Sequence, residues 1–140
     1  AIDTLSTCIA SAVRPAFLYS LKNATLESPF RVLNTASASA LFTFEGISVE
    51  DGRNYYMNAT LAYKRACLNA IEYLQKFGYS GEQAYLLLGS APIEGRISGI
   101  VDIPNACASL YLPTAIFDFD IRPTADGPRK ADRGQCAMTS

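Results

Sequence analysis

The segment FDFDI carries two carboxylates whose spacing could support chemistry. Asp118 and Asp120 alternate with apolar residues, which predicts a strand that presents both carboxylates on one face. Such a pair could serve in acid/base catalysis or bind a hard cation. It could equally be the solvated face of a half-buried strand, which requires polar side chains at alternating positions. We favour the solvated face.

A second group of polar residues flanks an apolar segment. Residues 97–103 alternate in a way that predicts a buried strand, and Pro104 terminates it. Polar side chains at the end of a rigid strand often border a site, although Asn and Asp are also common turn formers. We predict Asp102, Asn105 and Glu94 as the substrate-binding residues, which line a pocket or orient a ligand rather than attack the substrate.

The chain contains no histidine, which excludes serine–histidine and cysteine–histidine mechanisms within it. The cysteines are widely separated and lack the compact spacing of zinc sites: Cys8, Cys67, Cys107 and Cys136. We therefore predict no catalytic residue and no metal ligand in this chain. We expect reduced, structural cysteines. A secreted, disulfide-bonded glycoprotein stays an alternative, because the cysteine count is even and two N-x-T sequons occur.

The composition is that of an ordinary globular protein. Of 140 residues, 49% are hydrophobic and 18% are charged, so the chain is one domain or a fragment of one. A net charge of -1 gives no electrostatic reason to bind nucleic acid or an anionic membrane. No apolar run is long enough to span a bilayer, and the N-terminus does not resemble a signal peptide. We expect a cytoplasmic protein with no membrane and no nucleic-acid partner.

The segment 58–77 predicts the longest helix, with Asn58 as its N-cap and Gly78 as its C-terminal stop. A ridge of small side chains, four residues apart, favours close packing on a sheet: Ala62, Ala66 and Ala70. In the same helix Leu68 and Leu74 are predicted to be buried. Arg65 and Asn69 are predicted to lie on a solvated polar stripe. Ser80 and Gln83 have capping-box spacing, which predicts a second helix that ends at Gly89.

Three further strands are predicted, at residues 30–33, 41–49 and 107–112. Apolar residues at both odd and even positions of 41–49 predict a sheet that is covered on both faces. Asp51-Gly52 predicts a tight turn. Tyrosines elsewhere are most simply core or interface aromatics: Tyr55, Tyr56 and Tyr85. The chain is divided into an N-terminal segment (1–27), a central region (28–123) and an extended tail (124–140).

Four segments occur in order across more than half of the chain: FEGISV, YLQKFGYSGEQAYLLL, RISGIVDIPNA and LPTAIFDFDIRP. Together they resemble the C-terminal part of the acetamidase/formamidase family. The resemblance implies an α+β fold, mostly β sheet or sandwich with a helical hairpin over roughly residues 58–88. It also implies an oligomer, and hydrolysis of a small amide substrate, such as formamide or acetamide, to a carboxylate and ammonium.

The resemblance further implies a zinc ion that activates water, bound by histidine and aspartate residues of the N-terminal half, outside this chain. On this interpretation the chain is the C-terminal part of a formamidase-like enzyme and is inactive without a complementary N-terminal chain. Its partner is that chain or, through self-association, another copy of itself. The alternative is a non-catalytic remnant that serves as a structural or interaction protein.

Overall fold

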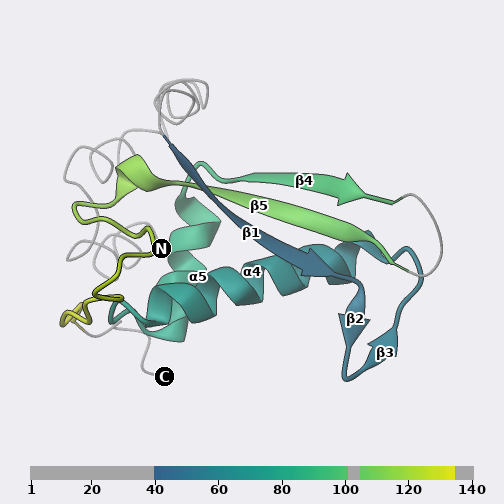
Figure 1. Ribbon diagram of the computed structural model, residues 1–140, viewed down its shortest axis with the longest axis horizontal. Coiled ribbons are helices and arrows are strands. Elements are labelled where there is room, and N and C mark those ends of the chain that lie inside the picture. The colour runs from purple at the N-terminus through teal and green to yellow at the C-terminus, as the bar shows by residue number, and fades with distance from the viewer. Residues whose placement is uncertain (1–39, 101–104, 135–140) are drawn as a thin grey trace.

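The computed structural model describes residues 40–100 and 105–134, which form an antiparallel sheet with helices on one face (Figure 1). The elements, in chain order, are β1 (Leu41–Ile47), β2 (Val49–Glu50), β3 (Arg53–Asn54), α4 (Ala59–Gln75), α5 (Gly81–Ser90), β4 (Glu94–Gly99), β5 (Cys107–Pro113) and a 3-10 turn, η1 (Thr114–Ile116). The α+β class is confirmed. The predicted strand at 30–33 lies outside the described residues. None of the helices within them is long and apolar enough to cross a membrane.

β5 is the central strand of the sheet, with β1 on one side and β4 on the other, and both pairings are antiparallel. Leu110 and Leu112 of β5 are fully buried. Their partners in β1 are Phe44 and Phe42. Because side chains alternate along a strand, these four residues share one face of the sheet, and α4 lies against that face (Figure 1). This inner face and α4 supply much of the hydrophobic core.

The outer face of the sheet is open along β1, so the expectation that both faces of this strand are covered was wrong. Leu41 and Ile47 lie on this outer face and are exposed, as are the polar residues Thr43 and Glu45 between them. Apolar residues at the two ends of the strand gave both faces an apolar pattern. Burial of the second face requires another layer of protein, and the described residues provide only one.

The backbones of α4 and β1 touch through small residues. Ala62, Ala66 and Ala70 are fully buried, as the predicted ridge requires. Gly46 of β1 lies directly beneath them: a Cβ atom at this position would be 2.2 Å from the carbonyl oxygen of Ala62 and 2.3 Å from the amide nitrogen of Ala66. Only glycine permits this approach, because any side chain would overlap the helix backbone.

Local signals set the ends of both helices. Asn58 caps α4, and its side-chain oxygen accepts the backbone N–H three residues later at 3.0 Å. Gly78 adopts the left-handed conformation, with φ of 98°, just after α4. Ser80 and Gln83 form the predicted capping box, with hydrogen bonds of 3.1 and 2.8 Å. α5 continues through Gly89, so the prediction that it ends there was wrong.

The predicted burial or exposure of side chains on α4 is correct at two positions and wrong at a third. Leu74 is fully buried, as predicted, whereas Leu68 is 42% exposed and is not part of the core. No described element covers Leu68, which explains the difference. Asn69 is exposed, as predicted for the polar stripe, but its Nδ2 also donates a hydrogen bond of 2.7 Å to the carbonyl oxygen of Glu45. Asn69 therefore ties the helix to β1.

β4 is an exposed strand and not the buried strand predicted over residues 97–103. It spans Glu94–Gly99, and every residue before Gly99 is exposed, including Ile97 at 62%. Residues 101–104 lie outside the described part of the chain. The alternating pattern correctly indicated a strand, but burial depends on neighbours, and β5 is the only described strand beside β4.

After β5 the chain turns at η1 and forms no further helix or strand in the described residues up to 134, so the strand predicted over FDFDI was wrong. The burial pattern was nevertheless correct: Phe117 and Ile121 are buried and Phe119 is partly buried. The backbone of this segment bonds to a side chain of α4 instead of a neighbouring strand, because Tyr73 Oη donates to the carbonyl oxygen of Ile121 at 2.6 Å. Aromatic packing holds the segment, as in the 5.5 Å contact between the Phe119 and Phe77 rings.

The last described residues lie against the junction of the two helices. Arg133 is only 9% exposed, its Nε donates to the carbonyl oxygen of Phe77 at 3.2 Å, and its guanidinium carbon is 4.2 Å from the Phe119 ring centre. Ala131 donates its backbone N–H to the same carbonyl at 3.2 Å. Gln83 Nε2 donates to the carbonyl oxygen of Arg133 at 2.9 Å. This segment therefore satisfies a carbonyl group just beyond the end of α4.

Candidate functional site

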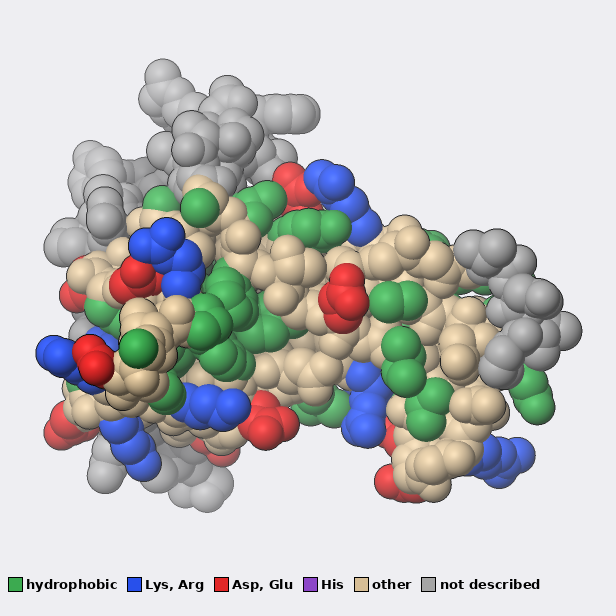
Figure 2. Space-filling model, in the orientation of Figure 1, with side chains coloured by type: hydrophobic (Ala, Val, Ile, Leu, Met, Phe, Trp, Pro, Cys, Tyr) green, Lys and Arg blue, Asp and Glu red, His purple; other side chains and the backbone are tan. Residues whose placement is uncertain are grey.

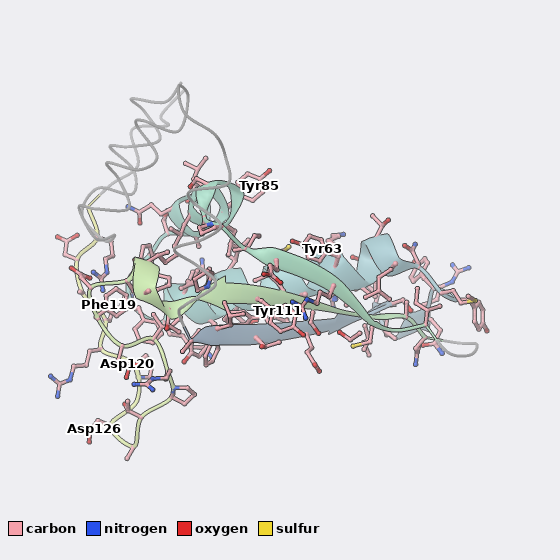
Figure 3. All side chains as sticks on the ribbon, turned by 90° about the horizontal axis from the view of Figure 1, so that it is seen from above. Tyr63, Tyr85, Tyr111, Phe119, Asp120 and Asp126 are labelled. Atoms are coloured by element: carbon pink, nitrogen blue, oxygen red, sulfur yellow. The ribbon has the colours of Figure 1, made fainter. Side chains whose placement is uncertain are left out.

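A charged and aromatic cluster lies on the outer face of the sheet. Glu94 and Arg96 of β4 point to this face, because a side chain at the intervening Gly95 would strike Tyr63 of α4. Arg96 Nη2 lies 2.6 Å from Glu94 Oε2. The Arg96 guanidinium carbon lies 4.9 Å from the ring centre of Tyr111, which is labelled on β5 in Figure 3. The hydrogen bond with Glu94 raises the pKa of Arg96. The Arg96 guanidinium group is therefore held over the Tyr111 ring.

Two serine hydroxyls, one on β4 and one on β5, also lie on the outer face. The Ser98 hydroxyl is hydrogen-bonded to that of Ser109, which is almost fully buried. Among the described residues neither hydroxyl is hydrogen-bonded to a carboxylate, and the chain has no histidine. A serine nucleophile needs a neighbouring base, so this pair joins the strands rather than forming a catalytic dyad.

The predicted substrate-binding residues do not form one cluster within the described part of the chain. Glu94 is opposite Tyr111, near the end of β5. Asn105 is exposed and lies just before the start of β5. At ~3.3 Å per residue, these two positions are roughly 20 Å apart along the strand. Asp102 lies outside the described residues. Contact of any of the three with a substrate stays a prediction.

Asp118 and Asp120 are not a carboxylate pair on a strand, because this segment forms no strand. Asp120 Oδ1 accepts hydrogen bonds from the backbone N–H and the Nε of Arg122, both at 2.9 Å, and its Oδ2 accepts from Nη2 at 2.7 Å. The side-chain bonds, followed by the backbone bond, lower the pKa of Asp120 to about 2. Asp118 is exposed. The Asp120 carboxylate is therefore occupied in fixing a loop.

An apolar cavity of about 400 Å³ lies between α4, α5 and the chain before β4. Tyr63 and Cys67, four residues apart on α4, line it together with Tyr85 of α5. Tyr63 and Tyr85 are labelled in Figure 3. Burial raises the pKa of both the Tyr63 hydroxyl and the Cys67 thiol. Both groups therefore stay protonated at neutral pH, and Cys67 is a poor nucleophile. The only sequence signal for this cavity is the spacing of Tyr63 and Cys67.

A second hollow, of about 390 Å³, lies beside the C-terminal described segment. Charged residues of both signs line it, Asp120 and Asp126 among them (Figure 3). Arg122 is already paired with Asp120, and Arg133 is buried against Phe119. Most of these charges thus hold the loop together.

The described residues do not fit a zinc ion. The chain has no histidine, and within residues 40–100 and 105–134 no three Cys, Asp or Glu side chains come together as a metal site. Protein zinc sites use three or four such ligands. Among the described residues, Cys67 and Cys107 are free thiols. Cys8 and Cys136 lie outside the described residues.

The chain is similar to known amide hydrolases. The profile of the Acetamidase/Formamidase family matches residues 16–119, which begins well before the motifs quoted above. The formamidase of Methylophilus methylotrophus is 58% identical over 113 residues, which are 79% of this chain and 27% of that protein. The acetamidase of Mycolicibacterium smegmatis is 66% identical over 59 residues, 41% of this chain and 14% of that protein.

A solved structure shows the same relationship. The gamma lactamase from Delftia acidovorans is 61% identical in sequence and superposes with a TM-score of 0.67 over 71% of this chain and 25% of that chain. This chain therefore spans about a quarter of the length of the formamidase and the lactamase. Because the family profile covers most of its residues, this chain belongs to the acetamidase/formamidase family.

Proposed function

We propose that this chain supplies one segment of a formamidase-like amide hydrolase, which converts a short aliphatic amide and water into a carboxylate and ammonium. The observation that carries the proposal is the 58% identity to a formamidase over a length that is only 27% of that enzyme. The open outer face of the sheet supports it, because a segment of a larger protein leaves surfaces that the remainder covers. A cytoplasmic, oligomeric enzyme is part of the same proposal.

Within this enzyme the described residues act as scaffold rather than as reacting groups. The Cys67 thiol is protonated, the Ser98 and Ser109 hydroxyls bond to each other, and the Asp120 carboxylate is held by an arginine. The base and any metal ligands thus come from protein outside the described residues, on a complementary chain or segment. Glu94 contributes by fixing Arg96, whose guanidinium group lies over the Tyr111 ring.

The test is a chimera of this chain and the Methylophilus formamidase. The 113 matched residues of that enzyme are replaced by those of this chain, and ammonium release from formamide is measured. We expect the chimera to hydrolyse formamide, and the isolated 140-residue chain to be inactive. The parent enzyme and a deletion that lacks the segment are the controls. A chimera that folds with a cooperative thermal transition but has no activity would contradict the proposal.

One observation favours a second candidate, a non-catalytic structural or interaction protein. The chain has no histidine, and its described residues contain no cluster of metal ligands. An inactive but folded chimera, together with a stable homo-oligomer of the isolated chain, would favour this candidate over the amide hydrolase.

A further inference from the structure

The hairpin of β2 and β3 leads into an exposed cluster of large side chains. We call this surface the hairpin corner, and it consists of Ile47, Arg53, Tyr55, Tyr56 and Met57. Eight large hydrophobic side chains are exposed among the described residues, and four of them belong to this corner. Hydrophobic side chains are visible where the hairpin joins the sheet (Figure 2). Clustering of this kind distinguishes an interaction surface from apolar residues scattered singly.

The hairpin corner is held in place by the body of the protein. Tyr55 donates its backbone N–H to the carbonyl oxygen of Ser48 at 2.8 Å. Ser48 is fully buried, and its hydroxyl accepts the N–H of Ala106 at 2.9 Å. Lys64 Nζ of α4 lies 2.8 Å from Glu50 Oε1 of β2. These contacts fix the corner before any partner binds, which lowers the entropy lost on binding.

Met57 has an unusual backbone conformation for its residue type. Its φ of 57° lies in the left-handed region, which is energetically unfavourable for a residue that carries a side chain. Despite this cost, the conformation leaves both Met57 and the neighbouring Tyr56 largely exposed. Strained, exposed positions of this kind are concentrated at functional surfaces, and Met and Tyr are enriched in protein interfaces.

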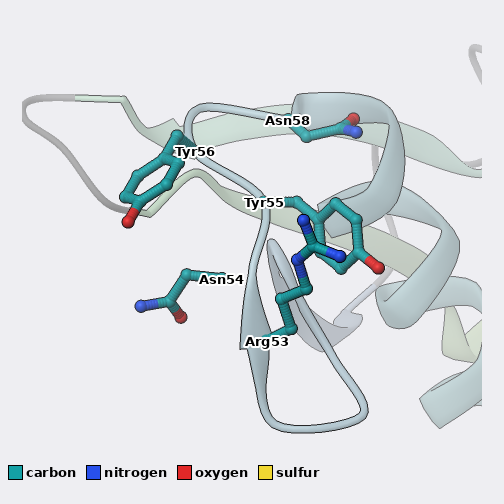
Figure 4. A pocket seen from close by; sticks show the side chains of 5 residues that line it. All are labelled: Arg53, Asn54, Tyr55, Tyr56 and Asn58. Carbon is teal, nitrogen blue, oxygen red and sulfur yellow. The ribbon is translucent and has the colours of Figure 1, made fainter.

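The corner also presents a positive charge. The guanidinium carbon of Arg53 lies 5.5 Å from the ring centre of Tyr55, and no carboxylate among the described residues pairs with Arg53. A shallow hollow of about 570 Å³ adjoins it, between Tyr55 and Tyr56 (Figure 4). Asn54 and Asn58 also line the hollow, so this arrangement suits a protein segment that brings a polar or aromatic side chain into the hollow and a carboxylate to Arg53.

We propose that the hairpin corner is the docking surface for the remaining polypeptide of the acetamidase/formamidase enzyme, and that this polypeptide places a carboxylate against Arg53. The inference rests on the proposed function. Its partner follows from the comparison of lengths: the segment that matches this chain makes up 27% of the formamidase, so the other 73% of that polypeptide is available to cover the surfaces left open here. The aromatic, arginine-containing corner is the anchor of that contact.

The experiment measures binding between the full 140-residue chain and a tagged Methylophilus formamidase that lacks the 113 matched residues. The two are co-expressed and purified, and the dissociation constant is determined by sedimentation. We expect a stable complex, and at least a tenfold weaker one for the double variant Tyr56→Ala/Met57→Ala and for Arg53→Glu. Tyr85→Ala is the matched control, because Tyr85 is 68% exposed and Tyr56 is 64% exposed. Its affinity should equal that of the parent chain.

The possible results separate the two proposals. If the parent chain and all variants bind equally well, the docking surface is elsewhere, while an active chimera would leave the amide hydrolase standing. If the parent chain does not bind the remaining polypeptide, the docking proposal is wrong whatever the chimera does. If the chain dimerises alone and the corner variants abolish that dimer, the occupant is a second copy and the proposed partner is wrong. Unchanged thermal transitions establish that the variants fold.

Discussion

The two faces of the three-stranded sheet are built from the same strands, but residues on the inner face are buried and residues of β1 on the outer face are exposed. On the inner face Gly46 lets α4 approach until the backbones touch, and Leu110 and Leu112 are sealed from water. On the outer face Ile47 is exposed although it is as apolar as the buried residues. The apolar content of a strand therefore does not decide which face is buried. The layer that lies over each face decides it.

The largest contrast is expected between two glycines of the sheet. Gly46→Ala places a Cβ atom 2.2 Å from a backbone oxygen of α4, so the helix must move away, at a cost of about 3 kcal/mol or more. At Gly99, in β4, the same substitution meets no atom within 4 Å and should change stability by less than about 0.5 kcal/mol. Urea unfolding measures the free energy of unfolding of both variants. Equal midpoints for the two variants would disprove the close contact of helix and sheet.

Two leucines of α4 give the second contrast. Leu74 is fully buried, and Leu74→Ala should lower the free energy of unfolding by about 2–5 kcal/mol. Leu68 is 42% exposed, and Leu68→Ala should cost less than about 1 kcal/mol. Denaturant unfolding of the two variants under the same conditions measures both losses of free energy. A large loss at Leu68 would mean that protein beyond the described residues covers the outer side of α4.

The smallest effect is expected for an exposed ion pair. Arg122 lowers the pKa of Asp120 from 3.8 to about 2, so the folded state favours the carboxylate. The resulting stabilisation is present above about pH 4 and is lost as the pH falls towards 2. Because the pair is exposed, the stability difference between the parent chain and Asp120→Asn should be slight at pH 7, and it should shrink further as the pH falls through about 2. An Asp120 carboxyl titration midpoint near 3.8 by NMR would refute the pairing.

The elements that the sequence predicts well have signals within a few residues. Asn58, Gly78 and the Ser80–Gln83 capping box mark helix ends through hydrogen bonds and φ values that are local in origin. The segment after β5 shows the limit. The alternation of Phe117 and Phe119 with aspartates correctly predicts which side chains face inward. It does not indicate whether a neighbouring strand is present to form hydrogen bonds with the backbone.

The candidate site was harder to predict, because it depends on register and on neighbours. Glu94 and Asn105 are close in sequence, yet the antiparallel pairing of β4 with β5 places them far apart along the sheet. The sequence predicts Tyr55 and Tyr56 as core or interface aromatics, and only their exposure in the folded chain distinguishes these two roles. Local composition cannot supply that information, because exposure is a property of the surrounding chain.

The position of β5 has a consequence for the order of folding. β5 is the middle strand of the sheet but the last to be synthesised, and β1 and β4 form no ladder with each other. At about 5–20 residues per second, β1 leaves the ribosome several seconds before the strand that completes it. During that interval α4 can already lie on Gly46, so a helix shields one side of a single strand. The sheet can therefore form only after its central strand has been synthesised, and the pairing of β1 with β5 closes a long loop.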